Sequence, residues 1–324
     1  METSLPRRLA RILLAGLIAA GMAQASAATA RAQDSAAAAQ AEGAEDAQWT
    51  TPRITRPGLA YVTYESAAAA ARVSFHVYTP PQYDRETDRR FPVLYWLHGT
   101  GGGVRGIASV TAHFDAAIAA GKIAPMIVVF PNGLATGMWT DSADGRRPVE
   151  TILVSEIVPQ VDRAYRTIAT AEGRILEGFS MGGLGAARIG FRHPGLFGTI
   201  SMIAAGPLDP DFNGPRARGN PALRRRVLDE VHGGSLARFR AESAWELSAL
   251  RARQDTAPGP MRLVIGTADF TAGDNQRFHQ HLGQQGIAHE YVEVPGVGHD
   301  VLALFAAMGE SNWAFYRRVT GAPR

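Results

Sequence analysis

The sequence predicts an α/β fold with a mostly parallel central sheet, an antiparallel N-terminal strand pair and helices on both faces. Short, nearly continuous apolar segments alternate with helical segments, which is typical of parallel strands buried on both sides. Ahead of them, Leu59–Tyr64 and Val73–Tyr78 alternate in polarity, are rich in Val, Tyr and Phe, and are separated by the alanine tract Ala67–Ala71. These two segments are expected to form the antiparallel pair.

The remaining strands and helices follow in alternation. Strands are expected at Phe91–Leu97, Ile127–Phe130, Arg174–Phe179, Thr199–Ile203, Arg262–Ile265 and Glu290–Val294. Helices are expected at His113–Ala120, Glu150–Tyr165, Leu184–Arg192, Ala222–Val231, Leu236–Arg253, Asn275–Gln285 and Val301–Arg318. The stretch Gly206–Pro221 is dense in Gly, Pro, Asp and Asn, so we expect a loop there.

The composition is that of a globular chain. Of the 324 residues, 46% are apolar and only 19% are charged, which excludes an intrinsically disordered protein. The absence of cysteine excludes a disulfide framework. One α/β domain over residues 51–324 accounts for the pattern.

The N-terminal segment has the organisation of a secretory signal peptide. Three arginines precede the apolar run Ile12–Ala23, and small residues follow it. The run is shorter than the roughly 20 residues that span a bilayer, so no stable membrane anchor is expected. We predict a signal peptide over residues 1–32, cleaved after Ala27 or Ala32, then a flexible linker over 33–50. The mature protein would be periplasmic or extracellular.

The high isoelectric point has its source in this segment. The whole chain has a formal charge of +3, which alone would suggest a nucleic-acid partner. Residues 1–32 contain four arginines and one glutamate, so the rest of the chain is formally neutral. No nucleic-acid partner is therefore predicted.

A candidate nucleophile lies between an expected strand and an expected helix. The segment Gly178-Phe179-Ser180-Met181-Gly182 fits Gly-x-Ser-x-Gly, the pattern of a nucleophile elbow. Glycines are needed two residues before and after the serine because strand and helix converge there. The turn would expose the Ser180 hydroxyl and place the Met181 N–H at a helix N-terminus, facing a developing oxyanion. A glycine-rich turn with an incidental serine is the competing interpretation.

A candidate acid and a candidate base follow later strands, in the order that an elbow serine requires. Asp269 follows the strand ending at Ile265, and His299 follows the strand ending at Val294. Asp274 competes with Asp269 for the role of the acid, although it could instead cap the helix near Asn275. Asp300 adjoins the base and would point elsewhere. His299 would take the Ser180 proton, and the acid would orient the imidazole.

A glycine-rich loop follows the first parallel strand. In Leu97-His98-Gly99-Thr100-Gly101-Gly102-Gly103, the Thr100 N–H is the candidate second oxyanion donor. Residues 101–106 also fit the dinucleotide pattern Gly-x-Gly-x-x-Gly. That alternative needs an acidic residue at the end of the next strand, where Pro131-Asn132-Gly133 stands instead.

Together these motifs resemble the esterase D, or putative esterase, family of α/β-hydrolases, over about residues 75–315. Two further stretches carry the resemblance, Trp139–Ser142 and Glu156–Asp162. It implies the triad Ser180, Asp269 and His299 and an oxyanion hole of Thr100 and Met181. The family often has a large aromatic residue close after the histidine, whereas Val301-Leu302 follow here.

The resulting hypothesis is an exported serine carboxylic-ester hydrolase that needs neither cofactor nor metal. Feruloyl or acetyl esters of polysaccharide are the favoured substrates. A siderophore esterase or an acyltransferase of the same fold, and a non-catalytic binding module, are the alternatives. Trp139 is interpreted either as a wall of the acyl pocket or as a packing residue. His279, His281 and His289 are expected to be surface histidines rather than metal ligands.

Overall fold

The computed structural model of the protein describes residues 49–206, 212 and 220–321. The predicted signal peptide, nearly all of the predicted linker and most of the predicted loop Gly206–Pro221 lie outside the described residues. Trp49, which the prediction placed in the linker, is 92% buried and packs against one of the two core clusters. Its carbonyl accepts a hydrogen bond of 3.0 Å from the Ser74 N–H.

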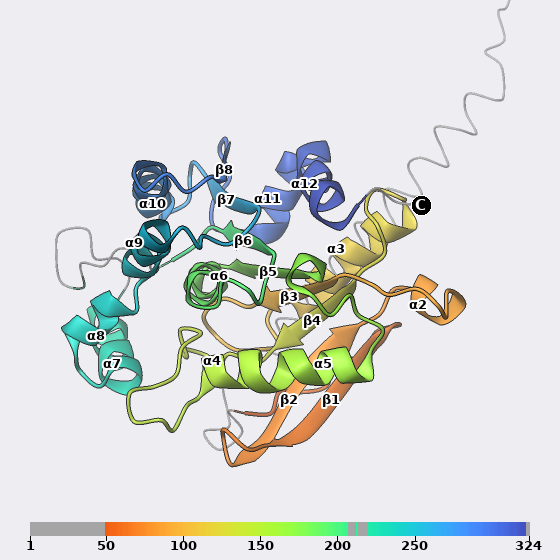
Figure 1. Ribbon diagram of the computed structural model, residues 1–324, viewed down its shortest axis with the longest axis horizontal. Helices are drawn as coiled ribbons and strands as arrows, with labels where there is room; N and C mark the ends of the chain where they lie inside the picture. Colours follow the sequence, from red (N-terminus) through yellow and green to blue (C-terminus); the bar gives the residue numbers. More distant parts are fainter. Residues whose placement is uncertain (1–48, 207–211, 213–219, 322–324) are drawn as a thin grey trace, which may run out of the picture.

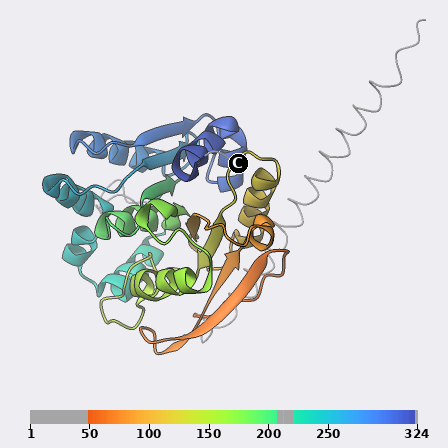
Figure 2. The same cartoon turned by 45° about the vertical axis from the view of Figure 1, so that its right-hand side comes forward.

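The sheet of the described chain has eight strands in the order β1-β2-β4-β3-β5-β6-β7-β8. They are β1 (Leu59–Ser66), β2 (Ala71–Tyr78), β3 (Val93–Leu97), β4 (Ile127–Pro131), β5 (Arg174–Phe179), β6 (Thr199–Ile203), β7 (Met261–Gly266) and β8 (Glu290–Val294). β1 pairs antiparallel with β2, and β2 with β4, whereas the pairs from β4 to β8 are parallel. The hairpin and β8 stand at opposite edges (Figures 1 and 2). The predicted fold class is confirmed.

Helices cover both faces of the sheet. One face packs against α4 (Val149–Thr151), the π-helix η1 (Ile152–Ile157), α5 (Val158–Ala164), α6 (Met181–Arg192), α9 (Ala244–Gln254) and α10 (Ala272–Gln284). The other face packs against α3 (Ile107–Ala119), α11 (Val301–Met308) and α12 (Glu310–Thr320). The short elements are α2 (Gln82–Arg85) and the 3₁₀ turn η2 (Ala171–Gly173). Finally, α7 (Pro221–His232) and α8 (Leu236–Ala241) project beyond the sheet (Figure 1).

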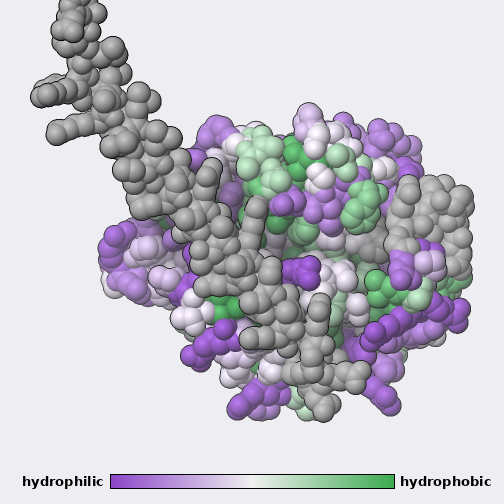
Figure 3. Space-filling model, turned by 180° about the vertical axis from the view of Figure 1, so that it is seen from behind, coloured by the Kyte–Doolittle hydropathy of each residue, from purple (hydrophilic) through white to green (hydrophobic). Residues whose placement is uncertain are grey.

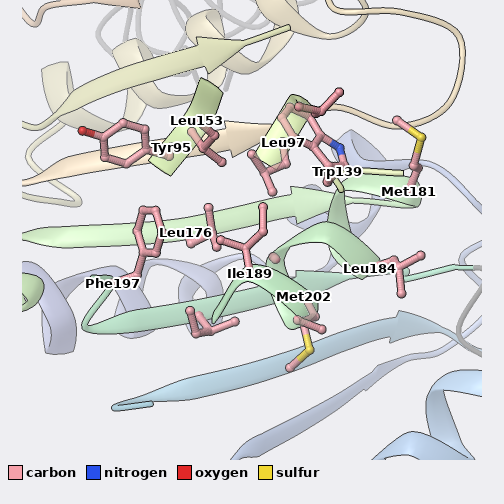
Figure 4. Close-up of a cluster of buried hydrophobic side chains, with 14 of the residues drawn as sticks. Tyr95, Leu97, Trp139, Leu153, Leu176, Met181, Leu184, Ile189, Phe197 and Met202 are labelled. Carbon is pink, nitrogen blue, oxygen red and sulfur yellow. The ribbon is translucent and has the colours of Figure 1, made fainter. Parts of the chain in front are cut away.

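The interior between the sheet and α6 is built from large apolar side chains of neighbouring strands. Tyr95, Leu176 and Met202 come from β3, β5 and β6 and have no exposed surface. Ile189 of α6 packs into the same cluster, as Figure 4 shows. Because this layer is continuous, the ends of these strands are held at fixed positions relative to one another.

Two predicted helices are each two helices in the structure. The segment Leu236–Arg253 is broken at Ser243, whose side chain accepts a hydrogen bond from the Glu246 N–H and begins α9. The segment Val301–Arg318 is broken at Gly309, which has φ 52° and ψ −121°. Both predictions of a single helix are wrong because a capping serine and a glycine interrupt the helical hydrogen bonding.

The predicted helix Glu150–Tyr165 is helical up to Ala164 but passes through a π turn. Pro159 lies at the start of α5 and has no N–H to donate. The Val158 N–H donates to the Leu153 carbonyl, five residues back, which is the π pattern. The wider turn lets the helix continue past the proline.

Few large apolar side chains reach the surface of the described chain: Phe270 is 62% exposed, Leu223 40% and Ile168 38%. The back of the molecule mixes hydrophilic and hydrophobic residues (Figure 3). Within the described residues, no helix combines the length and apolarity needed to cross a bilayer.

Candidate active site

Ser180 occupies a strained turn between β5 and α6. Its φ of 58° and ψ of −121° lie in a region that residues other than glycine rarely adopt. Glycine is required at both flanking positions. A Cβ added to Gly178 would lie 2.2 Å from the Gly182 carbonyl oxygen, and one added to Gly182 would lie 1.9 Å from the Leu97 carbonyl oxygen. The two glycines therefore allow α6 to pack closely against β3 and β5.

Backbone hydrogen bonds hold the turn in place. The Ser180 N–H donates to the Ile203 carbonyl at 3.0 Å, so the turn is anchored to the end of β6. The Ser180 carbonyl accepts hydrogen bonds of 3.1 Å from the N–H groups of Leu184 and Gly206. The hydroxyl is left as the reactive group of this residue at the carboxyl edge of the sheet.

The structure brings the sequence-predicted serine, histidine and aspartate into one chain of hydrogen bonds. His299 Nε2 lies 2.9 Å from Ser180 Oγ, and His299 Nδ1 lies 2.7 Å from Asp269 Oδ2. Asp269 follows β7 and His299 follows β8, so three parallel strands deliver the three side chains to one edge. With Nδ1–H donating to the carboxylate, Nε2 is free to accept the serine proton.

The Asp269 carboxylate is buried, and both of its oxygens take part in hydrogen bonds. Its second oxygen, Oδ1, accepts hydrogen bonds from the Thr271 N–H at 2.8 Å and the Thr271 Oγ1 at 2.9 Å. Burial by itself would raise the pKa of Asp269. The hydrogen bonds from His299 and Thr271 outweigh it and lower the pKa below the ordinary carboxyl value. Asp269 is therefore an anion at neutral pH.

The other two carboxylates near the histidine are engaged elsewhere. Asp274 lies in the first turn of α10 and forms an ion pair with Arg277. Asp300 caps α11, because its Oδ1 accepts hydrogen bonds from the N–H groups of Leu302 and Ala303. Of the two acid candidates, the structure places Asp269 rather than Asp274 against the imidazole.

Two phenylalanines flank the imidazole. The rings of Phe179 and Phe270 each lie 4.6 Å from the His299 ring, centroid to centroid. Phe179 precedes the serine, whereas Phe270 follows the aspartate and is largely exposed. The ring of His299 is thus held in place by two aromatic contacts as well as by its two hydrogen bonds.

The loop after β3 lies beside the serine. A Cβ added to Gly99 would be 3.2 Å from Ser180 Cβ, so the loop backbone passes very close to the elbow. His98 holds the loop: its Nε2 accepts from the Gly133 N–H at 2.9 Å, and its Nδ1 donates to the Gly99 carbonyl at 2.7 Å. Burial lowers the pKa of His98 to about 4, so the ring is neutral and keeps this tautomer.

The two predicted oxyanion donors come from this loop and from the elbow. Thr100 lines the cavity in front of Ser180, and Met181 is the first residue of α6. The Met181 side chain is buried in the core, so only its backbone faces the turn (Figure 4). The N-terminus of α6 adds a favourable field for negative charge at this point.

Trp139 is a packing residue beneath the loop. Its side chain has no exposed surface, and its Nε1–H donates to the His98 carbonyl at 3.1 Å. A Cβ added to Gly185 of α6 would lie 2.5 Å from the indole. The neighbouring Met138, not Trp139, lines the cavity. The structure therefore supports the interpretation of Trp139 as a packing residue and not as a wall of the acyl pocket.

A cavity of about 530 Å³ opens in front of Ser180. Its lining includes apolar side chains from several elements: Trp96, Val110, Met138, Phe179, Phe212, Leu223, Val227, Phe239, Phe270 and Val301. The helices α7 and α8 form one side, and the rings of Phe212 and Phe239 meet there at 5.7 Å. Mostly apolar walls with a few polar groups are typical of a small-molecule site.

Comparison with known proteins gives the family. The family model described as "Putative esterase" matches residues 66–318. The chain belongs to this esterase family. A Mycobacterium tuberculosis protein named as an esterase is 31% identical over 263 residues, which cover 75% of this chain and 56% of that protein. An endo-1,4-beta-xylanase/feruloyl esterase of Xylanibacter ruminicola is 31% identical over 169 residues, covering 49% of this chain and 23% of that protein.

A solved structure titled ferulic acid esterase shares the fold with this esterase-family chain. Its TM-score is 0.64 at 22% identity, over 81% of this chain and 98% of the other. The chain spans about half the length of the Mycobacterium tuberculosis relative and less of the Xylanibacter one.

The sequence did not reveal every residue that shapes the site of this family member. Arg188 of α6 is 97% buried and donates hydrogen bonds to the Met138 carbonyl and to Thr140 Oγ1, at 3.1 and 2.7 Å. It thereby fixes the segment carrying Met138 and Trp139, both of which have positive φ. An arginine in the middle of a helix carries no signal of such a contact, which tertiary packing alone creates.

The three histidines considered as metal ligands are hydrogen-bonded within the protein. His279 Nδ1 lies 2.7 Å from His289 Nε2, and His281 Nε2 lies 3.0 Å from Ser248 Oγ. Among the residues described, no three His, Cys, Asp or Glu side chains are grouped as ligands of one metal ion.

Proposed function

We propose that the protein is a serine carboxylic-ester hydrolase in which Ser180 is the nucleophile, His299 the general base and Asp269 the residue that orients it. The observation that carries the proposal is the hydrogen-bond chain from Asp269 through His299 to Ser180, at the wall of an apolar cavity. Membership of the esterase family supports it.

Acylation follows from these positions. Ser180 Oγ attacks the ester carbonyl carbon while His299 Nε2 takes the hydroxyl proton. The tetrahedral intermediate collapses as its bond to the alcohol oxygen breaks, and His299 returns the proton to that oxygen. The alcohol leaves, and the acyl group remains on Ser180. Asp269 stabilises the imidazolium that exists between the two proton transfers.

Deacylation repeats the sequence with water. His299 takes a proton from a water molecule as its oxygen attacks the acyl carbon, and then returns the proton to Ser180 Oγ. The carboxylic acid is released and the serine is restored. In both halves the N–H groups of Thr100 and Met181 would donate to the oxyanion. Removal of one such donor typically costs about 10² to 10³ in turnover.

Esters of polysaccharide, with feruloyl or acetyl groups, are the substrates we propose. Two relatives named above carry the word feruloyl or ferulic in their printed names. A cavity of about 530 Å³ with aromatic and aliphatic walls fits an aromatic acyl group. Such substrates lie outside the cell, in agreement with the signal peptide predicted for residues 1–32.

Replacement of the serine tests the chemistry. Ser180→Ala should abolish release of p-nitrophenol from short-chain p-nitrophenyl esters. Ser311→Ala is the matched control, because that hydroxyl lies at the surface and donates only to the Met308 carbonyl. Equal rates for wild type and Ser180→Ala, or no activity from folded wild type, would overturn the proposal.

A panel of esters tests the proposed substrate class. Methyl ferulate, acetylated xylan and siderophore esters should be compared by kcat/KM, with sugar added in parallel reactions to detect acyl transfer. Preference for methyl ferulate or acetylated xylan supports the polysaccharide-ester assignment. A preference for siderophore esters, or acylated sugar as the main product, would replace it.

A further inference from the structure

Two arginine side chains belong to the described lining of the cavity in front of Ser180. Three charged side chains lie in its described lining, Arg105, Arg224 and Asp274. The Asp274 carboxylate forms an ion pair with Arg277 of the same helix. Arg105 and Arg224 thus bring guanidinium groups into described walls that are otherwise mostly apolar.

Arg105 lies beside the oxyanion loop. Its side chain folds back over Gly101, where an added Cβ would lie 3.1 Å from Nε and 3.2 Å from Nη2. Gly101 follows Thr100 directly, so the guanidinium lies over the residue that comes after the candidate oxyanion donor. Its charge also acts on His98, whose pKa it helps to lower.

Arg105 has no acidic partner in the described part of the chain. It is exposed to the cavity and its mouth, and none of the ion pairs among the described residues includes it. Arg224 reaches the same cavity from a different element, the helix α7. A guanidinium presents several N–H donors in one plane, which suits a carboxylate or a phosphate.

We propose that, among the esters that Ser180 would cleave, those that carry a carboxylate or a phosphate elsewhere on the acyl or the alcohol half are preferred, because this anion binds Arg105, with Arg224 as a further cationic residue of the wall. The inference rests on the proposed ester hydrolysis at Ser180 and adds a charge requirement to it. The apolar walls would hold the hydrocarbon part of the substrate.

A pair of matched substrates tests the charge requirement. p-Nitrophenyl hexanoate and the mono-p-nitrophenyl ester of adipic acid have acyl chains of the same length, and only the second carries a terminal carboxylate. The readout is the ratio of kcat/KM for the charged ester to that for the neutral one. A ratio cancels any effect of a variant on the chemical step common to both. A second pair, 4-acetoxybenzoate and its methyl ester, carries the charge on the alcohol half instead.

Arg105→Gln should lower the charged-to-neutral ratio about tenfold to a hundredfold for at least one pair, the range of a charge-assisted hydrogen bond. Arg105→Lys should keep most of the ratio, and Arg224→Gln should lower it further in the double variant. Arg72→Gln is the control, because Arg72 lies on the surface hairpin and pairs with Glu65. Added salt should reduce the wild-type ratio.

Inhibition by phenyl phosphate and by 3-phenylpropionate distinguishes a phosphate from a carboxylate as the bound anion. The inhibitor with the preferred anion should have the lower inhibition constant in wild type, and its affinity should fall more in Arg105→Gln. An unchanged ratio in Arg105→Gln for both pairs would overturn the inference while Ser180-dependent hydrolysis persists. If hydrolysis does not depend on Ser180 at all, the proposed function has failed instead.

Discussion

Asp269→Asn is the most informative single change at the proposed triad. The two oxygens of Asp269 have different partners: Oδ2 faces His299 Nδ1, and Oδ1 accepts two hydrogen bonds from Thr271. An asparagine side chain has only one acceptor oxygen. Because the Thr271 N–H is a fixed donor, the asparagine oxygen is required at the Oδ1 position. Its NH₂ group then faces the imidazole.

This orientation gives His299 the wrong tautomer. The NH₂ group donates to Nδ1, so the ring proton moves to Nε2, where it blocks proton uptake from Ser180. Flipping the amide restores the tautomer but leaves buried donors unmatched, at about 1–3 kcal/mol each. Loss of the carboxylate beside the imidazolium removes about 1.5–3 kcal/mol more. A total of roughly 5 kcal/mol lowers kcat by between three and four powers of ten.

The assay is steady-state hydrolysis of a p-nitrophenyl ester at neutral pH, with the thermal unfolding of each variant measured alongside. Asp300→Asn is the matched control, because asparagine caps a helix as well as aspartate does and the adjacent backbone is the same. Its kcat should stay within about twofold of wild type. The reasoning is refuted if folded Asp269→Asn keeps a tenth of the wild-type kcat, or if Asp300→Asn loses as much.

Three further predictions concern stability. Gly182→Ala should fail to fold or lose activity, since its Cβ would meet the Leu97 carbonyl, whereas Gly283→Ala, with open space around it, should melt at or above the wild-type temperature. Glu156→Gln should lower the free energy of unfolding by about 2 kcal/mol in urea titrations. The Glu156 carboxylate accepts hydrogen bonds from Tyr64, Ser66 and Ala68 of the hairpin, and glutamine has one acceptor oxygen fewer. Burial lowers the pKa of His113 to about 4 in the folded protein, whereas the same imidazole takes up a proton near pH 6.5 in the unfolded chain. The free energy of unfolding should therefore fall as the pH is lowered from 6.5 to 4, by up to about 3 kcal/mol from this group. In the same urea titrations His113→Phe should show a smaller fall. An equal fall in the variant would contradict this prediction.

The strands and the elbow could be predicted because their signals are local. A short apolar segment such as β6 needs no partner to be recognised, and the bounds of Thr199–Ile203 agree with the prediction. The glycines around Ser180 are equally local, since the convergence of strand and helix excludes any side chain there. The break at Ser243 also had a signal, because Ser243 and Glu246 have the spacing of a capping box.

The parts that could not be predicted depend on contacts between distant segments. Arg188 reaches the segment around Met138, 50 residues away in sequence, and nothing near Arg188 indicates it. The burial of Trp139 follows from the packing of this segment against α6. The sequence alone therefore could not decide whether Trp139 lines the acyl pocket or packs in the core. The same holds for Arg105, whose place in the cavity depends on how the glycine loop folds back.

The proposed triad links segments far apart along the chain. Ser180 and His299 are separated by 119 residues, and His299 and Asp269 by 30. Their hydrogen bonds exist only after β5, β7 and β8 have taken their places in the parallel sheet, a slow type of assembly. Recovery of ester hydrolysis during refolding would thus time the completion of this half of the sheet, while recovery of helical circular dichroism would report earlier, local events. The proposed ester hydrolysis would therefore report a late step of folding that secondary-structure signals do not detect.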